Sequence, residues 1–122
     1  WEPFVPYQEG LKRLASSSAQ ILMAYGNETL YVPAKVFDYF LTGRPILCLS
    51  ASSELRHMVE GTSSGLTAEP TDVAGVAGML ERVIEARLTG TPMCQPNQVL
   101  TNEYSAPHTA GQLATLLNEI VA

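Results

Sequence analysis

Four polar side chains of different chemistry recur at helical spacing near the middle of the 122-residue chain. A cation, a carboxylate, a phenol and a hydroxyl fall at positions i, i+3, i+4 and i+7, so a helix would place them on one face. They are Lys35, Asp38, Tyr39 and Thr42. Such a face could hold a polar ligand, because an ammonium group attracts phosphate and a carboxylate can accept hydrogen bonds from sugar hydroxyls. The spacing alone favours a solvated surface pair of Lys35 and Asp38, worth about 0.3 kcal/mol, over a ligand site.

The sequence around these residues predicts a loop, a short helix, a stop and a strand. Pro33 suits the first turn of a helix, where its missing N–H costs nothing. Gly43 suits the left-handed residue that ends many helices, and Pro45 forbids continuation. The segment 46–49 is continuously apolar, which is typical of a strand covered on both faces. An apolar stripe is expected on the other side of the helix, formed by Val36, Phe37, Phe40 and Leu41.

Helix and strand signals alternate along the rest of the chain. Strands are expected at 19–24, 46–49 and 65–68, and an irregular stretch is expected at 88–102. Further helices are expected at 8–17, after Ser52 or Ser53, from the N-cap Thr71 to 87, and from Ser105 or Thr109 onward. This alternation predicts one α/β domain over residues 1–122, with a parallel sheet of a few strands and flanking helices.

The two helices of the C-terminal half are expected to be amphipathic, with an apolar face toward a core. The first face is formed by Val73, Val76, Ala77, Leu80, Val83 and Ile84. The second is formed by Leu113, Leu116, Leu117 and Ile120.

Composition limits the classes of function. The formal net charge is −5, whereas a bulk nucleic-acid binder is normally basic, so nucleic acid is not an expected partner. No apolar run approaches the ~20 residues of a membrane span and no secretory signal opens the chain, so a cytoplasmic location is expected. The chain begins without Met and reads like an excerpt of a longer protein. Its two cysteines, Cys48 and Cys94, are expected to be reduced and structural.

Several other chemistries lack their sequence patterns. His57 and His108 stand alone, and no spacing of His, Cys and Asp resembles a zinc site, so neither a metal nor a cofactor is expected. Serines follow the second expected strand, but no Gly-x-Ser-x-Gly elbow surrounds them. The sequence also contains no Walker loop and no Gly-x-Gly-x-x-Gly fingerprint.

In an open parallel sheet, ligands bind beyond the carboxyl ends of the strands. Three segments meet that condition, namely 25–32, 50–53 and 68–71. The first leads into the amino end of the helix that carries Lys35, where free backbone N–H groups and the helix dipole favour an anion such as phosphate. A lysine is unfavourable in a first helical turn unless an anion is also present. The sequence therefore indicates a candidate ligand site at this end of the helix.

The segment 33–47 resembles the nucleotide-sugar-binding segment of GT-B glycosyltransferases of the group 1 (GT4-like) family. Members often carry Pro-x-Lys-x-x-Glu-Tyr, a small or apolar pair, Gly and Pro; this chain reads PAKVFDY at 33–39, followed by Gly43 and Pro45. Segments 5–15, 53–66 and 71–87 and the terminal helix are similar to neighbouring parts of that family. The resemblance implies that the chain is part of the C-terminal, donor-binding Rossmann-like domain.

The resemblance implies roles for five residues. In the family, a glutamate at the position of Asp38 binds the ribose hydroxyls of the nucleotide sugar, and aspartate here is one methylene shorter. Lys35 stands where the family's lysine approaches the donor diphosphate. Pro33, Ala34 and Tyr39 belong to the same substrate-binding segment.

The resemblance also implies what the chain does not contain. A second common pattern of the family has an additional glutamate that would align with Leu30, and Glu28 lies out of register with it. The active site of a GT-B enzyme lies between two Rossmann-like domains. The missing acceptor domain of the parent chain is therefore an expected partner, and residues 1–122 alone are expected to be inactive. An exposed sheet edge, able to pair with a second copy as a homodimer, is expected where the first strands of the domain would lie.

Three hypotheses of different class remain. The first is an enzyme part, the region of a glycosyltransferase that binds a nucleotide diphosphate sugar. The second is a non-catalytic Rossmann-like module for assembly or nucleotide binding. The third, a response-regulator-like domain, would need an acidic cluster after the first strand and a late lysine, and no acidic pair follows any expected strand.

Overall fold

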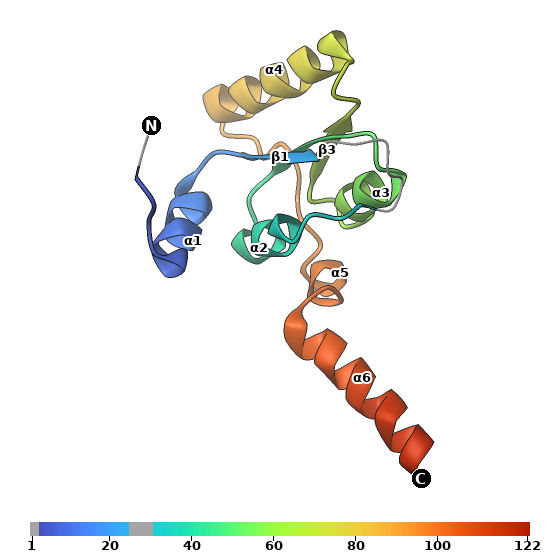
Figure 1. The fold of residues 1–122 in the computed structure, drawn as a ribbon. Helices are drawn as coiled ribbons and strands as arrows, with labels where there is room; N and C mark the ends of the chain where they lie inside the picture. Colours follow the sequence, from blue (N-terminus) through green and yellow to red (C-terminus); the bar gives the residue numbers. More distant parts are fainter. Residues whose placement is uncertain (1–2, 25–30) are drawn as a thin grey trace.

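The computed structural model of the chain describes residues 3–24 and 31–122. A three-stranded parallel sheet in the order β1-β2-β3 forms its centre (Figure 1). β1 (Gln20–Ala24) pairs with β2 (Ile46–Ser50), and β2 pairs with β3 (Gly65–Ala68). The predicted α/β class, a parallel sheet of a few strands with flanking helices, is confirmed.

Helices cover both faces of the sheet. α2 (Lys35–Thr42) and α3 (Ser53–Gly61) lie on one side, and α4 (Val73–Thr89) lies on the other (Figure 1). α1 (Tyr7–Ser16) packs beside α2. α5 (Gln98–Asn102) and α6 (Ala106–Val121) follow, and α6 extends away from the sheet (Figure 1).

α2 has the boundaries that its sequence predicts. The carbonyl of Pro33 accepts a hydrogen bond from the N–H of Val36 in the turn that leads into the helix. Gly43 ends the helix in the left-handed region, with φ at 63°. The predicted apolar stripe is only half right: Val36 and Phe40 are buried, whereas Phe37 is 40% exposed and Leu41 is 69% exposed. Val36 and Phe40, one turn apart, place the buried side of this short helix against the sheet.

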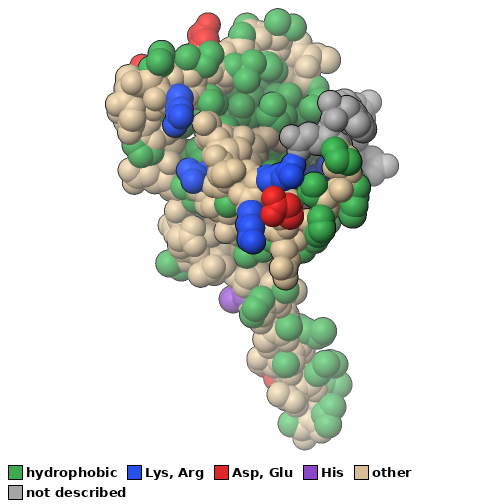
Figure 2. Space-filling model, turned by 90° about the vertical axis from the view of Figure 1, so that its left-hand side faces the viewer, with side chains coloured by type: hydrophobic (Ala, Val, Ile, Leu, Met, Phe, Trp, Pro, Cys, Tyr) green, Lys and Arg blue, Asp and Glu red, His purple; other side chains and the backbone are tan. Residues whose placement is uncertain are grey.

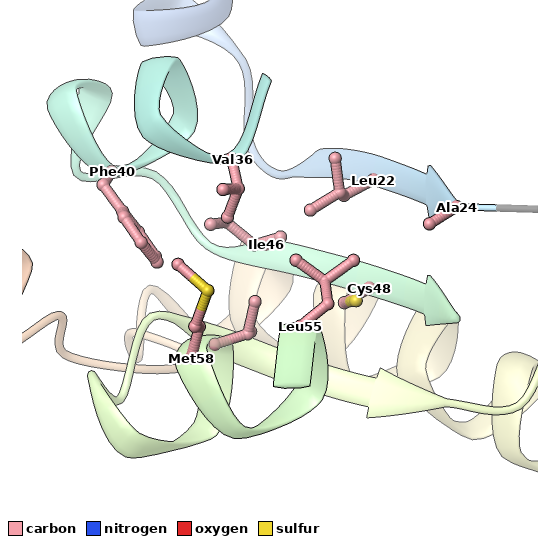
Figure 3. Close-up of a cluster of buried hydrophobic side chains, with 9 residues drawn as sticks. Leu22, Ala24, Val36, Phe40, Ile46, Cys48, Leu55 and Met58 are labelled. Atoms are coloured by element: carbon pink, nitrogen blue, oxygen red, sulfur yellow. The ribbon is translucent and has the colours of Figure 1, made fainter. Parts of the chain in front are cut away.

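The main hydrophobic core lies between the sheet and the helices α2 and α3 (Figure 3). Its members are Leu22, Ala24, Val36, Phe40, Ile46, Cys48, Leu55, Met58 and Val59. A second, smaller core lies on the other face of the sheet, where Leu47 and Ala68 meet Met79 of α4. β2 contributes to both cores, which confirms the prediction that this strand is covered on both faces.

β1 is buried on one face only, so the prediction of a buried strand at 19–24 is partly wrong. Leu22 and Ala24 enter the main core, whereas Ile21 is 53% exposed and Met23 is 49% exposed. In the part of the sheet that the structure describes, β1 is an edge strand, and α4 packs against β3 at the opposite edge. The face of β1 that carries Ile21 and Met23 therefore lacks the cover that α4 gives to its neighbours.

α4 differs from its prediction in its cap and in its buried face. The N-cap is Asp72 rather than Thr71, because the Asp72 carboxylate accepts a hydrogen bond from the N–H of Gly75 at 2.9 Å. Met79 is the residue of α4 that is buried, and Val76 and Val83 pack beside it. Other members of the predicted face stay exposed, namely Val73, Leu80 and Ile84. The sheet is narrow, so it covers only part of the apolar surface of this helix.

The stretch 88–102, predicted as irregular, contains α5. Asn97 is its N-cap, and the Asn97 side-chain oxygen accepts hydrogen bonds from the N–H groups of Val99 and Leu100. The N–H of Asn97 donates to the carbonyl of Thr62 at 2.9 Å, which ties this segment back to the turn before β3. Asn97 was the sequence signal that could have indicated α5, because asparagine is common at helix N-caps.

α6 begins at Ser105, one of the two predicted start residues, whose hydroxyl accepts a hydrogen bond from the N–H of His108. None of its residues is buried, so its apolar face does not pack on a core. The exposed side chains of that face are Leu113, Leu116, Leu117, Ile120 and Val121. Periodicity correctly predicted the helix, but it carries no information on what covers the helix.

Alanine substitutions at Gly65 and Gly78 should change the free energy of unfolding in opposite directions. A Cβ atom at Gly65 would lie 1.8 Å from the carbonyl oxygen of Ile46 in the neighbouring strand. We expect Gly65→Ala to lower the free energy of unfolding by about 3 kcal/mol, because the backbone itself must move. Gly78→Ala, in the middle of α4 with no atom within 4 Å of the new Cβ, should instead raise it by about 1 kcal/mol. Urea denaturation measures both, and equal effects would contradict the strand register.

The reactivity of the Cys48 thiol should distinguish the folded from the unfolded protein. Both cysteines are free, as predicted, and burial raises the pKa of Cys48 to about 11. We expect Cys48 to resist thiol reagents at pH 8 in the folded protein and to react on unfolding, because the thiolate is the nucleophile. Its raised pKa also means that the stability it contributes is present below pH 9.0 and is lost as the pH rises through about 11. Fast labelling of native Cys48, followed by mass spectrometry, would contradict its burial.

Candidate functional site

A hollow of about 440 Å³ lies between α1 and α2. Three of the five residues expected to bind substrate line it, namely Lys35, Asp38 and Tyr39. The remaining wall is largely apolar and comes from the N-terminal segment and α1, with Phe4, Val5, Tyr7, Gly10, Leu11 and Leu14. A mainly apolar cavity of this size with a few polar groups is typical of a small-molecule site.

Asp38 is held by a residue that the sequence analysis did not single out. The hydroxyl of Tyr7 donates a hydrogen bond to Oδ1 of Asp38 at 2.6 Å, across 31 positions of sequence. This hydrogen bond and the negative charge of Asp38 raise the pKa of Tyr7. No local sequence signal marks Tyr7, because its partner becomes a neighbour only when α1 packs against α2.

Tyr39 lies partly buried beside Asp38 and donates its hydroxyl to the carbonyl of Ile21 at 3.3 Å. Burial, followed by the charge of Asp38, raises the pKa of Tyr39. Lys35 is exposed and forms no ion pair with any residue that the structure describes. Within the described part of the chain, its ammonium group is therefore left to solvent or to a ligand.

Thr42, on the same predicted face, takes a structural role. The side-chain amide of Gln20 donates to the Thr42 hydroxyl at 2.7 Å and to the carbonyl of Leu14 at 3.2 Å. The Thr42 hydroxyl in turn donates to the carbonyl of Tyr39. These bonds join the carboxyl end of α2 to α1 and β1, so the polar face of α2 divides into a structural end and an end that lines the hollow.

Pro33 and Ala34 shape the amino end of α2 and do not line the hollow. The carbonyls of Pro33 and Ala34 accept hydrogen bonds from the N–H groups of Val36 and Phe37 at 3.0 and 3.2 Å. These two N–H groups were among those expected to be free for an anion. Because they are engaged in the turn, Lys35 is the stronger candidate for attracting a phosphate.

The segments that follow β1 and β2 were also expected to lie near a ligand. Most of 25–32 lies outside the described residues, and so do Glu28 and Leu30. After β2, the hydroxyl of Ser50 accepts from the N–H of Ser52, and the hydroxyl of Ser52 caps α3 by accepting from the N–H of Leu55. These serines therefore shape a turn and a helix start.

No cluster of His, Cys, Asp and Glu that could hold a metal ion occurs among residues 3–24 and 31–122. His57 and His108 are exposed. Across those same ranges, every helix is too short or too polar to cross a membrane. The face that carries α1 shows Lys and Arg side chains separated by hydrophobic and polar ones rather than a continuous basic surface (Figure 2).

Comparison with protein-family models, with curated proteins and with solved structures found no match to this chain.

The contact between Asp38 and Tyr7 can be tested by titration. We expect Asp38→Asn to lower the pKa of Tyr7 toward its ordinary value, because the neutral amide removes the charge that favours the protonated phenol. NMR spectra of the protein with labelled tyrosine rings, recorded between pH 8 and 12, would measure this shift. Asp72→Asn, at the N-cap of α4, serves as the control and should leave Tyr7 unchanged. An unchanged titration in Asp38→Asn would show that the two side chains do not interact in solution.

Proposed function

We propose that residues 1–122 form the donor-binding portion of a glycosyltransferase, which transfers a sugar from a nucleotide diphosphate sugar to an acceptor. In this proposal Asp38 accepts hydrogen bonds from the ribose hydroxyls and Lys35 attracts the diphosphate. Pro33 and Ala34 form the turn that sets the direction of α2, and Tyr39 forms part of the wall beside Asp38.

The observation that carries the proposal is the common hollow of Lys35, Asp38 and Tyr39. These residues belong to the segment that resembles the donor-binding segment of group 1 GT-B enzymes. α2 follows a parallel strand and runs back along the sheet, which is the arrangement in which doubly wound folds bind nucleotides. The opposite wall of the hollow is apolar, as suits the flat face of a nucleobase.

A second candidate, a non-catalytic module for assembly, is favoured by a different observation. Ile21 and Met23 are about half exposed on β1, an edge strand of the sheet formed by the described residues, and the apolar face of α6 is also exposed. An edge strand with an uncovered face can pair with another chain or with the acceptor domain of the same parent chain. This candidate requires no ligand in the hollow between α1 and α2, and ligand binding therefore separates the two.

The donor site can be tested by titrating UDP, GDP and their sugars into the intact protein that contains residues 1–122. We expect Asp38→Asn and Lys35→Met each to weaken binding by about tenfold, because each removes a charge-assisted contact of about 1.5 kcal/mol. Isothermal titration calorimetry measures the affinities. Residues 1–122 alone should bind weakly and show no sugar transfer, because acceptor binding would need the second domain.

Matched controls are available for both charges. Lys12→Met removes an exposed cation of α1, and Glu81→Gln removes an exposed carboxylate of α4; neither residue lines the hollow. Both should leave the affinity unchanged. The site assignment is wrong if the Asp38 and Lys35 variants bind as tightly as the wild type, and absence of any nucleotide binding would favour the assembly module.

A further inference from the structure

Tyr7 donates a hydrogen bond to Asp38, but the proposed donor site gives Tyr7 no role. Its hydroxyl is the described partner of the Asp38 carboxylate, and both side chains line the hollow between α1 and α2. Tyr7 is the first residue of α1, whereas Asp38 lies one turn inside α2. The contact therefore depends on how the two helices pack against each other.

We infer that Tyr7 is a positioning residue that fixes the Asp38 carboxylate and so gives the hollow its preference for a ribose with both of its hydroxyls. This inference rests on the proposed donor site and adds the class of sugar that the site distinguishes. Asp38 is partly exposed, and an exposed carboxylate that is free to rotate must be ordered when ligand binds. The hydrogen bond from Tyr7 orders it beforehand.

The count of acceptors explains the preference for two hydroxyls. A carboxylate offers about four acceptor positions, and Tyr7 occupies one of them on Oδ1. Oδ2 receives no hydrogen bond from the described residues, so it can accept from one ribose hydroxyl. The second acceptor position of Oδ1 can accept from the adjacent hydroxyl. The two oxygens of one carboxylate are thus left to accept from the two neighbouring hydroxyls of a ribose.

A deoxyribose would leave one of these acceptors without its donor. The ribose form therefore makes one charge-assisted hydrogen bond more than a deoxy form, and the preference is modest because Asp38 and Tyr7 stay partly exposed. The alternative is that the bond between Tyr7 and Asp38 only joins α1 to α2. That role would make Tyr7 important for stability but indifferent to the sugar.

The two roles can be separated with the nucleoside diphosphate that binds, UDP or GDP, and its 2′-deoxy and 3′-deoxy analogues. We expect the wild-type intact protein to prefer the ribose form by about tenfold. Tyr7→Phe should reduce this ratio about threefold by weakening the ribose form more than the deoxy forms. In an Asp38→Asn background, Tyr7→Phe should have no further effect, since the two residues act as one unit.

Thr115→Val is the control, because it removes an exposed hydroxyl of α6 that lines neither of the hollows in which Tyr7 and Asp38 lie. It should leave the ratio unchanged. The inference is overturned if Tyr7→Phe weakens the ribose and deoxy forms equally, or if the ratio does not change. If the wild-type protein binds no nucleoside diphosphate, the proposed donor site is wrong as well. Binding to the wild-type protein with an unchanged ratio would instead contradict only the role of Tyr7.

Discussion

The burial of β2 between two helical layers is the constraint on which the rest of the structure depends. Its side chains alternate between the main core, which holds Ile46 and Cys48, and the smaller core, which holds Leu47. Its backbone pairs with both neighbouring strands. The helices α2, α3 and α4 then take their positions from the face of the sheet that each covers. Gly65 keeps β3 close because any larger residue would meet the β2 backbone.

The position of the candidate site follows from this arrangement. Val36 and Phe40 anchor α2 on the main core, which turns the remaining side of the helix toward α1. Asp38 and Lys35 lie on that side, so they can change without loss of the buried contacts that hold the helix. The same eight-residue helix therefore packs on the core with one side and lines the candidate site with the other.

The sequence correctly predicted the features that depend on residues close together in the chain. Gly43 ends α2 in the left-handed region, and the strand 46–49 is covered on both faces, both as predicted. What it missed depends on contacts between distant segments. Tyr7 reaches Asp38 across 31 positions, and no periodicity in either segment encodes that distance. Apolar stripes also overstate burial, since they report which face could be covered and not whether a partner covers it; α4 and α6 both show this.

The exposure of α6 has a consequence for how this chain unfolds. None of its residues is buried, so little of its helical structure is coupled to the sheet. An isolated helix of this length is only marginally stable in water. Warming would therefore fray α6 gradually while the sheet and its covering helices remain intact. Far-ultraviolet circular dichroism and a probe of the core would then follow different curves, because α6 frays before the sheet and the helices packed on it are lost in one cooperative step.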